Sequence, residues 1–166
     1  MSTKKKHSIL FVCLGNICRS PTGEAILKKI VHEKGQQDLF HIESAGTGAY
    51  HIGERPDPRT RHHGEKRGLI FDSLAQQFQP QQHFDFFDSI LCMDENNLQI
   101  VRQKDPENRF IHKTHLMMSF APETGYTIVP DPYLGGPKDF ELVIDLLEVA
   151  CHQFYLKTLQ PKISEP

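Results

Sequence analysis

The sequence predicts an α/β fold: a three-layer sandwich in which helices cover both faces of a four-stranded parallel sheet. Two observations lead to this prediction. Short apolar segments, of the length that buried strands have, alternate along the chain with segments that carry helix signals. The clearest of the helical segments closes this pattern near the end of the chain. Strands that alternate with helices are typical of parallel sheets with right-handed crossover connections.

Four segments are the candidate strands. Ser8–Val12 is a short, continuous apolar run, as expected of a strand buried on both faces, and Ser89–Met93 has the same character. Phe40–Ala45 and Phe110–Lys113 are weaker candidates. Numbered along the chain, the four strands are expected to lie in the flavodoxin-like order 2-1-3-4. In such sheets ligands bind beyond the carboxyl ends of the strands, and Cys13 lies just past the end of the first one.

Helix signals fall between these strands. Ser20 stands in the position of a helix cap, Pro21 in that of a first helical residue, and Gly35 in that of a residue that ends a helix. Residues 58–67 and 95–103 are shorter helix candidates. Each of these segments separates two candidate strands, as a crossover helix does.

The helix with the strongest pattern covers about residues 139–158. Its apolar residues keep the three-and-four spacing of one buried face. These residues are Phe140, Val143, Ile144, Leu147, Ala150, Cys151 and Phe154. A helix with such a face is expected to pack directly on the sheet or on another helix.

The length of the chain indicates the number of domains, and its net charge indicates which classes of partner to expect. The 166 residues favour one domain, 1–166, with residues 1–6 and 159–166 as flexible tails. The formal net charge of −2 gives no argument for a nucleic acid or an anionic membrane as partner, so neither is expected. We expect a monomer or a weak dimer.

The N-terminal segment only superficially resembles a secretory signal. Lys4–Lys6 precede an apolar run, but this run covers only Ile9–Cys13, and no small-residue cleavage site follows it. No stretch of the chain approaches transmembrane length. The four cysteines are therefore interpreted as reduced thiols, and a cytoplasmic location is expected.

The segment Cys13–Pro21, which reads CLGNICRSP, carries the most chemical information. A glycine-bearing loop between a strand and a helix can turn consecutive backbone N–H groups toward one centre, and the start of the helix adds its positive end. The segment is therefore a candidate oxyanion cradle. It lacks the Gly-Lys-Ser/Thr ending of nucleotide-binding loops.

Cys13 and Arg19 stand at the two ends of this loop. Inward N–H groups, a helix dipole and a guanidinium each favour a thiolate over a thiol at Cys13. The planar fork of Arg19 can bind two phosphate oxygens at once and stabilise the charge of a phosphoryl group in transfer. An arginine in the first turn also opposes the helix dipole unless an anion lies beside it. The pair is therefore a candidate nucleophile and phosphoryl-binding residue.

Hydrolysis of a phosphate ester also needs an acid for the leaving oxygen, and three Asp-Pro pairs are candidates. Asp57 lies among arginines and is interpreted as an ion-paired helix start. Asp105 lies in a charged segment and is interpreted as part of a solvated surface turn. Asp131 lies between prolines in a long loop before the last helix, where its backbone would be stiff. The residues alone favour Asp131 but leave a rigid turn as an equal alternative.

The string CLGNICRSP resembles the signature of the low-molecular-weight protein tyrosine phosphatases. Three further segments resemble that family in the family's order: SAGTGAYHIGERPDPRT, DSILCMDENN and VPDPY. The resemblance covers about residues 7–158. It implies hydrolysis of aryl phosphomonoesters through a phosphocysteine intermediate, with no metal or cofactor. It also implies that Cys13 is the nucleophile, that Arg19 binds the phosphoryl group and that Asp131 is the general acid and later the base.

The resemblance also implies residues that support the loop. Asn16 and Ser20 match members of a hydrogen-bond network that includes the serine of the SAGT segment, here Ser44. The family network often contains a histidine as well, where this chain has Ser73. The rigidity of the loop is therefore in question at that position.

Tyr50 and Tyr133 match aromatic walls that flank an aryl substrate in the family. Ile17 is apolar where a related arginine-phosphatase branch has threonine, which favours an aryl phosphate. The expected partner is a phosphotyrosine protein or a small aryl phosphate. The residues expected to bind the substrate are Leu14, Gly15, Asn16, Ile17, Cys18, Ser20, Tyr50 and Tyr133.

The other cysteines have alternative interpretations. By resemblance, Cys18 could form a reversible disulfide with an oxidised Cys13, and a packed loop thiol is the alternative. Cys92, at a strand end, and Cys151, on the inner face of the last helix, are interpreted as core residues.

Two other functions remain to be compared. A thiol-dependent arsenate reductase of the same fold needs two further cysteines a short loop apart, but Cys92 has no such partner and Cys18 is in the wrong place. A non-catalytic phosphopeptide-binding module is disfavoured because Cys13, Arg19 and Asp131 are all present. Zinc is disfavoured because no second Cys/His pair has finger-like spacing.

Overall fold

The computed structural model describes residues 6–163, and its four parallel strands form a sheet in the order β2-β1-β3-β4. The predicted order is therefore confirmed. The central strand β1 pairs with β2 on one side and β3 on the other, and β4 forms the edge beside β3. The strands are β1 (His7–Cys13), β2 (Phe40–Gly46), β3 (Ser89–Cys92) and β4 (Thr114–Leu116).

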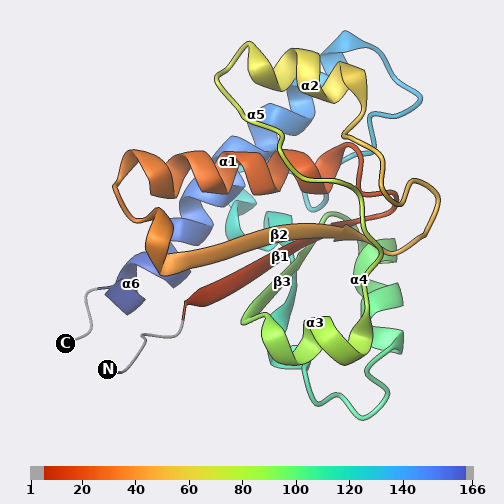
Figure 1. Cartoon of the computed structure of the whole chain (residues 1–166), viewed down its shortest axis with the longest axis vertical. Helices are drawn as coiled ribbons and strands as arrows, with labels where there is room; N and C mark the ends of the chain where they lie inside the picture. Colours follow the sequence, from red (N-terminus) through yellow and green to blue (C-terminus); the bar gives the residue numbers. More distant parts are fainter. Residues whose placement is uncertain (1–5, 164–166) are drawn as a thin grey trace.

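Helices cover both faces of this sheet (Figure 1). The side chains of β1 alternate between the two faces, as strand geometry requires. Ile9 and Phe11 pack into the larger core with the helices of one face, whereas Leu10 and Val12 pack into the core of the other. The larger core lies under α1 (Arg19–Glu33) and α5 (Pro137–Phe154), and the smaller under α3 (Pro80–Phe86) and α4 (Glu95–Gln103).

Shorter elements complete the fold. Helix α2 (Pro58–Glu65) packs against α5 on the side away from the sheet (Figure 1). A π-helical turn follows α5 and leads into α6 (Gln160–Ile163). The short turns are the 3₁₀ segments Gln37–Leu39, Ile111–Lys113, Met117–Phe120 and Pro122–Thr124 and the π segment Tyr155–Leu159.

The first helix begins two residues earlier than the sequence predicts. Its first residue is Arg19, and Ser20 does not cap it, because the Ser20 hydroxyl instead contacts the sulfur of Cys13 and the amide of Asn16. The predicted end is confirmed, since Gly35 follows the helix with a φ of 66°. Helix α1 therefore starts directly at the loop that carries Cys13.

The predicted strand 110–113 is wrong: the segment is a 3₁₀ turn, and β4 starts after it. Asp105 explains the difference. It is buried rather than solvated, and its carboxylate accepts hydrogen bonds from the backbone N–H groups of Arg109 and Phe110 at 2.9 and 2.8 Å. These bonds hold the chain in a turn, so the interpretation of Asp105 as a solvated surface residue is also wrong.

The remaining helices are close to prediction. Helix α4 has the predicted bounds, whereas α2 ends two residues early and α5 starts two residues early. The predicted tails fall mostly on residues 1–5 and 164–166, which lie outside the described residues. Leu159 is fully buried and helical, so the second tail starts too early in the sequence analysis. The single domain stays a prediction.

Two histidines of α2 have different surroundings. His62 is exposed, whereas His63 is buried. The imidazole of His63 stacks on Phe140 of α5 with ring centroids 5.9 Å apart, and its Nδ1 lies 2.9 Å from the carboxylate of Glu141. These contacts fix α2 against α5. Within residues 6–163, no helix combines the length and apolar character needed to cross a membrane.

Candidate active site

The loop from Cys13 to Arg19 connects β1 to α1 at the carboxyl end of the sheet. Asn16 has a φ of 58°, in the left-handed region, which turns the chain back toward Cys13. The backbone N–H of Asn16 points at the sulfur of Cys13 at 3.3 Å. The hydroxyl of Ser20 lies 3.0 Å from the same sulfur. The loop therefore closes around the buried Cys13 side chain.

The end of β2 holds this loop from the side. The backbone N–H groups of Thr47 and Gly48 donate to the carbonyl oxygens of Cys13 and Leu14 at 2.8 and 2.9 Å. A Cβ at Gly46 would lie only 2.7 Å from the carbonyl oxygen of Leu14. A glycine is required there because the two backbones approach so closely.

Arg19 is buried and held by one edge of its guanidinium. Its Nη1 donates to Asp94 at 2.7 Å and to the carbonyl oxygen of Val129 at 3.0 Å, whereas Nη2 lies 3.7 Å from the Asp131 carboxylate. Burial alone would lower the pKa of Arg19, but the charges of Cys13 and Asp94 raise it, with the net result above its ordinary value. Arg19 therefore stays a cation beside the Cys13 sulfur.

Asp131 lies at the mouth of the same site, in the long loop before α5. Its side chain is 47% exposed, so water and substrate can reach it. Its Oδ1 accepts the backbone N–H of Tyr133 at 3.0 Å, which fixes the carboxylate relative to that ring. The guanidinium of Arg59 lies 5.4 Å from the centroid of the Tyr133 ring and orients it in turn.

The predicted ion-paired role of Asp57 is confirmed, since it caps α2 and binds Arg59.

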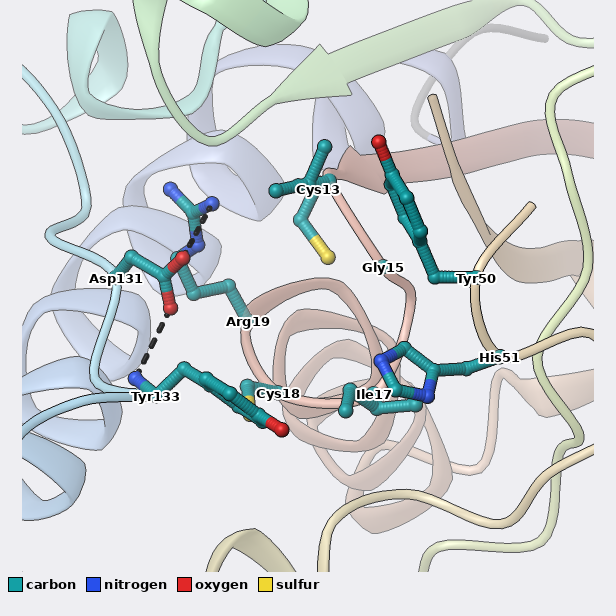
Figure 2. A pocket seen from close by; sticks show the side chains of 10 residues that line it. Cys13, Gly15, Ile17, Cys18, Arg19, Tyr50, His51, Asp131 and Tyr133 are labelled. Atoms are coloured by element: carbon teal, nitrogen blue, oxygen red, sulfur yellow. Dashed lines mark hydrogen bonds and ion pairs between the residues drawn. The ribbon is translucent and has the colours of Figure 1, made fainter. Parts of the chain in front are cut away.

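A pocket of about 390 Å³ unites these residues. Figure 2 shows the sulfur of Cys13 pointing into its centre, with Arg19 and Asp131 on one side and Tyr50 and His51 on the other. At its edge, Tyr50 is largely exposed to solvent and Tyr133 about half exposed. The lining residues are Cys13, Leu14, Gly15, Ile17, Cys18, Arg19, Tyr50, His51, Asp131 and Tyr133.

Three further predicted residues lie behind the pocket rather than in its wall. The side-chain amide of Asn16 donates to the hydroxyl of Ser20 at 2.7 Å and to that of Ser44 at 2.9 Å. All three are buried. They therefore form the expected hydrogen-bond network and hold the loop from within. Asn16 and Ser20 were also predicted to bind the substrate, and the structure does not place their side chains in the pocket lining.

The loop places a backbone N–H group and the guanidinium of Arg19 beside a buried thiol, an arrangement that can bind an oxyanion. Comparison with known proteins agrees with it. The sequence model of the family described as low molecular weight phosphotyrosine protein phosphatase matches residues 8–165. The chain belongs to this family.

Individual relatives support the assignment. The low molecular weight phosphotyrosine protein phosphatase of Rattus norvegicus is 40% identical over 159 residues, 95% of this chain and 99% of the relative. The crystal structure of a protein tyrosine phosphatase from Entamoeba histolytica has a TM-score of 0.89 and 39% identity, over 95% of this chain and 99% of that one. A drosophila arginine phosphatase has a TM-score of 0.82 and 30% identity, over 95% and 99%.

This phosphatase differs from the expected family pattern at Ser73, and the structure shows how the position is used. The Ser73 hydroxyl donates to Glu24 at 3.1 Å, and the Ser44 hydroxyl donates to the same carboxylate oxygen at 2.5 Å. The network therefore reaches position 73 through Glu24. The doubt that Ser73 raised about the support of the loop is answered by this contact.

Sequence reasoning missed three residues of the candidate site. Asp94 caps α4 and binds Arg19, and the segment MDENN could have indicated it. His51 lies at the edge of the pocket, with Nδ1 2.7 Å from Glu54, and only its position beside Tyr50 pointed to it. Glu24 is buried in α1 and carried no separate signal, because a glutamate four residues before a lysine is common on exposed helix faces.

The remaining cysteines of the phosphatase are buried. Burial is the main cause that raises the pKa of Cys18 to about 12, although a hydrogen bond with Thr60 opposes it. Burial also raises the pKa of Cys92 and of Cys151, and the two side chains have no exposed surface, so their interpretation as core residues is confirmed. All four cysteines are free thiols. A Cys13–Cys18 disulfide stays a prediction.

Proposed function

We propose that this chain hydrolyses aryl phosphomonoesters, phosphotyrosine in proteins among them, with Cys13 as nucleophile and the Cys13–Arg19 loop as phosphate-binding loop. One observation carries the proposal: the sulfur of Cys13, the free edge of Arg19 and the carboxylate of Asp131 face one pocket. A nucleophile, an oxyanion clamp and an acid are the three groups that the reaction needs.

In the first step, the Cys13 thiolate attacks phosphorus and an S–P bond forms while the P–O bond to the leaving group breaks. The leaving oxygen takes a proton from Asp131. Arg19 and the N–H groups of the loop bind the three remaining phosphoryl oxygens, whose negative charge they stabilise. Asp131 lies at the mouth of the pocket, whereas the sulfur of Cys13 is buried. These positions support an approach in which the phosphoryl group faces Cys13 and the leaving oxygen faces Asp131.

In the second step, water attacks the phosphocysteine. The Asp131 carboxylate takes a proton from that water, the S–P bond breaks, and inorganic phosphate leaves as the Cys13 thiolate is restored. Arg19 binds the phosphoryl group in both steps. The exposure of Asp131 supports this double role, because its carboxylate can meet both a leaving group and a water molecule.

The walls of the pocket favour an aryl substrate. Tyr50 and Tyr133 stand at opposite sides of the mouth, and the apolar Ile17 lines the interior (Figure 2). A phenyl ring carries its phosphate far enough from the backbone to reach a buried sulfur between such walls. We therefore propose a phosphotyrosine protein or a small aryl phosphate as the substrate.

Turnover of three phosphoresidues tests this substrate class. We expect phosphotyrosine peptides to be hydrolysed with a kcat/KM at least about tenfold above that for phosphoserine and phosphoarginine peptides, since one pocket contact discriminates by about that factor. Arginine is the informative competitor, because a drosophila arginine phosphatase shares the fold. A preference for phosphoarginine would contradict the aryl assignment. Activity that requires an added metal ion would contradict the cysteine mechanism.

The alternative functions have less support. Reduction of arsenate needs a relay of accessible cysteines, but Cys92 and Cys151 have no exposed surface. Arsenate reductase activity in the same assays would support that alternative. Binding of phosphotyrosine peptides without turnover would instead indicate a non-catalytic module. The cytoplasmic location and the monomer or weak dimer stay predictions from the sequence.

A further inference from the structure

The carboxylate of Glu24 is an unusual group to find in the first turns of α1. Its side chain is 4% exposed, and its carboxylate accepts hydrogen bonds from Lys28, Ser44 and Ser73. Oε1 accepts the hydroxyls of Ser44 and Ser73, and Oε2 lies 2.6 Å from the ammonium of Lys28. A carboxylate buried this deeply is stable in its charged form only beside a cation and hydrogen-bond donors. Lys28 is that cation.

Lys28 lies one helical turn after Glu24 and is partly buried. Its Nζ also lies 3.3 Å from the exposed carboxylate of Asp72. Burial alone would lower the pKa of Lys28, but its contacts with Glu24 and Asp72 raise it above its ordinary value. The ammonium therefore stays charged at the pH values at which enzymes of this kind are assayed, and it neutralises Glu24 from the side away from the loop.

A charged carboxylate can only accept hydrogen bonds, and this fixes the direction of the hydrogen bond between Glu24 and Ser44. Ser44 must give its proton to Glu24, so its oxygen is free to accept from the side-chain amide of Asn16. The carbonyl oxygen of that amide accepts the backbone N–H of Gln76 at 2.9 Å, so Gln76 and Ser44 hold the amide in one orientation from its two ends. Both amide protons are then used, one on Ser44 and one on Ser20.

Ser20 is the last member of this chain of hydrogen bonds. Because its oxygen accepts from Asn16, its own proton remains to be donated. The nearest acceptor is the sulfur of Cys13 at 3.0 Å, and the alternative, the carbonyl oxygen of Ala45, lies at 3.4 Å. A hydroxyl that donates to a thiolate stabilises it relative to the thiol.

We propose that Lys28 and Glu24 form a positioning pair for the reaction, which holds Ser44 as an acceptor for the Asn16 amide and so, together with Gln76, keeps the Ser20 hydroxyl donating to the Cys13 thiolate. The pair does not touch substrate and acts only through Ser44, Asn16 and Ser20. The proposal rests on the proposed function, in which that thiolate is the nucleophile. It assigns a role in the chemistry to a lysine on the outer surface of α1.

Other charged and titratable groups also face Cys13, and they set the size of the effect. Arg19 supplies the positive charge nearest to the sulfur, and its contacts do not involve Lys28. Loss of Lys28 should therefore reduce the thiolate population rather than abolish it. The groups that face Cys13 from the surrounding elements are Cys18 and Arg19 of the loop and α1, His51 after β2, Cys92 of β3, Asp94 before α4 and Asp131 before α5.

The substitution Lys28→Met tests the proposal, and Lys29→Met is its matched control. Lys29 is the next residue of the same helix and pairs with the exposed Glu33 at 2.8 Å, away from the network. The readout is the rate at which iodoacetamide alkylates Cys13, followed by mass spectrometry between pH 5 and 9. We expect Lys28→Met to alkylate about three- to tenfold more slowly near pH 6 and to converge with the parent at high pH, since one directed hydrogen bond is lost.

The control variants give the opposite expectation. Lys29→Met should follow the parent at every pH, and Lys28→Arg, which keeps the charge, should restore the parent profile. Steady-state kcat/KM should fall for Lys28→Met on the acid side only. If Lys28→Met proves unstable by thermal denaturation, Lys28→Gln, which keeps a donor but removes the charge, takes its place with the same expected profile.

Two results would overturn the proposal. One is an alkylation profile of the Lys28 variants that coincides with that of Lys29→Met. The other is a uniform loss at all pH values, which a merely structural role of Lys28 would produce. Alkylation needs no turnover, so a parent protein that alkylates as expected but hydrolyses no phosphomonoester would contradict the proposed function and leave the positioning pair supported.

Discussion

Replacement of Cys13 by serine is expected to abolish phosphatase turnover, with a loss of kcat of at least about 10⁴-fold, as removal of a covalent nucleophile does in other enzymes. A serine hydroxyl in the same place is a far weaker nucleophile because it is not ionised near neutral pH. The loop itself should persist, since the closing contacts come from Asn16, Ser20 and the end of β2. Vanadate or phosphate should therefore still bind, as calorimetry can measure.

Cys151→Ala is the matched control for the loss of a thiol. Cys151 is buried on α5, away from the pocket, and its thiol donates to the carbonyl oxygen of Gly23 at 3.7 Å. This variant should lose some stability but keep its kcat. A Cys13→Ser protein that retains measurable turnover above about 1% of the parent would rule out Cys13 as the nucleophile.

Replacement of Asp131 by asparagine should slow substrates according to their leaving groups. We expect a loss of about 10²–10⁴-fold for phosphotyrosine, whose phenolate needs a proton as it leaves. For nitrophenyl phosphate the loss of kcat/KM should be much smaller, because nitrophenolate leaves without a proton. Asparagine keeps an oxygen that can accept the N–H of Tyr133, so the aromatic wall should stay in place. The measurement is kcat/KM over a series of aryl phosphates.

Asp131→Ala serves as the comparison, because it removes both the acid and the acceptor for Tyr133. The kcat/KM of the alanine variant should fall further than that of the asparagine variant, by the same factor for every substrate. That extra loss would report the displacement of Tyr133. An asparagine variant that slows all leaving groups equally would count against Asp131 as the acid.

The central strands and the last helix could be predicted from sequence because their signals are local. The β1 residues that face the two cores are all apolar, and α5 keeps a single buried face over five turns. The edge strand β4 has only three residues, and the turn before it depends on the buried carboxylate of Asp105. Helix α3 was not predicted at all, because its seven residues are too few to show a period.

The residues of the candidate site also differ in whether their signals are local in the sequence. Cys13 and Arg19 stand in one short loop, so their spacing alone indicated an oxyanion site. Asp131 comes from a distant loop, and the residues alone did not distinguish it from a rigid turn until the family resemblance was considered. Glu24 and Asp94 gain their roles only from contacts made across the fold, with Ser44 and Arg19 respectively. A pair such as Glu24 and Lys28 looks in sequence like an ordinary surface ion pair.

Capture of the phosphorylated enzyme tests the central claim most directly. In Asp131→Asn, a nitrophenyl phosphate should still phosphorylate the enzyme, but the intermediate should accumulate because no carboxylate activates water. Rapid acid quenching, digestion and mass spectrometry would then locate the phosphoryl group, with fragmentation that separates Cys13 from Cys18. We expect one phosphoryl group on Cys13. A phosphoryl group on any other residue, or turnover without any phosphorylated enzyme, would contradict the account.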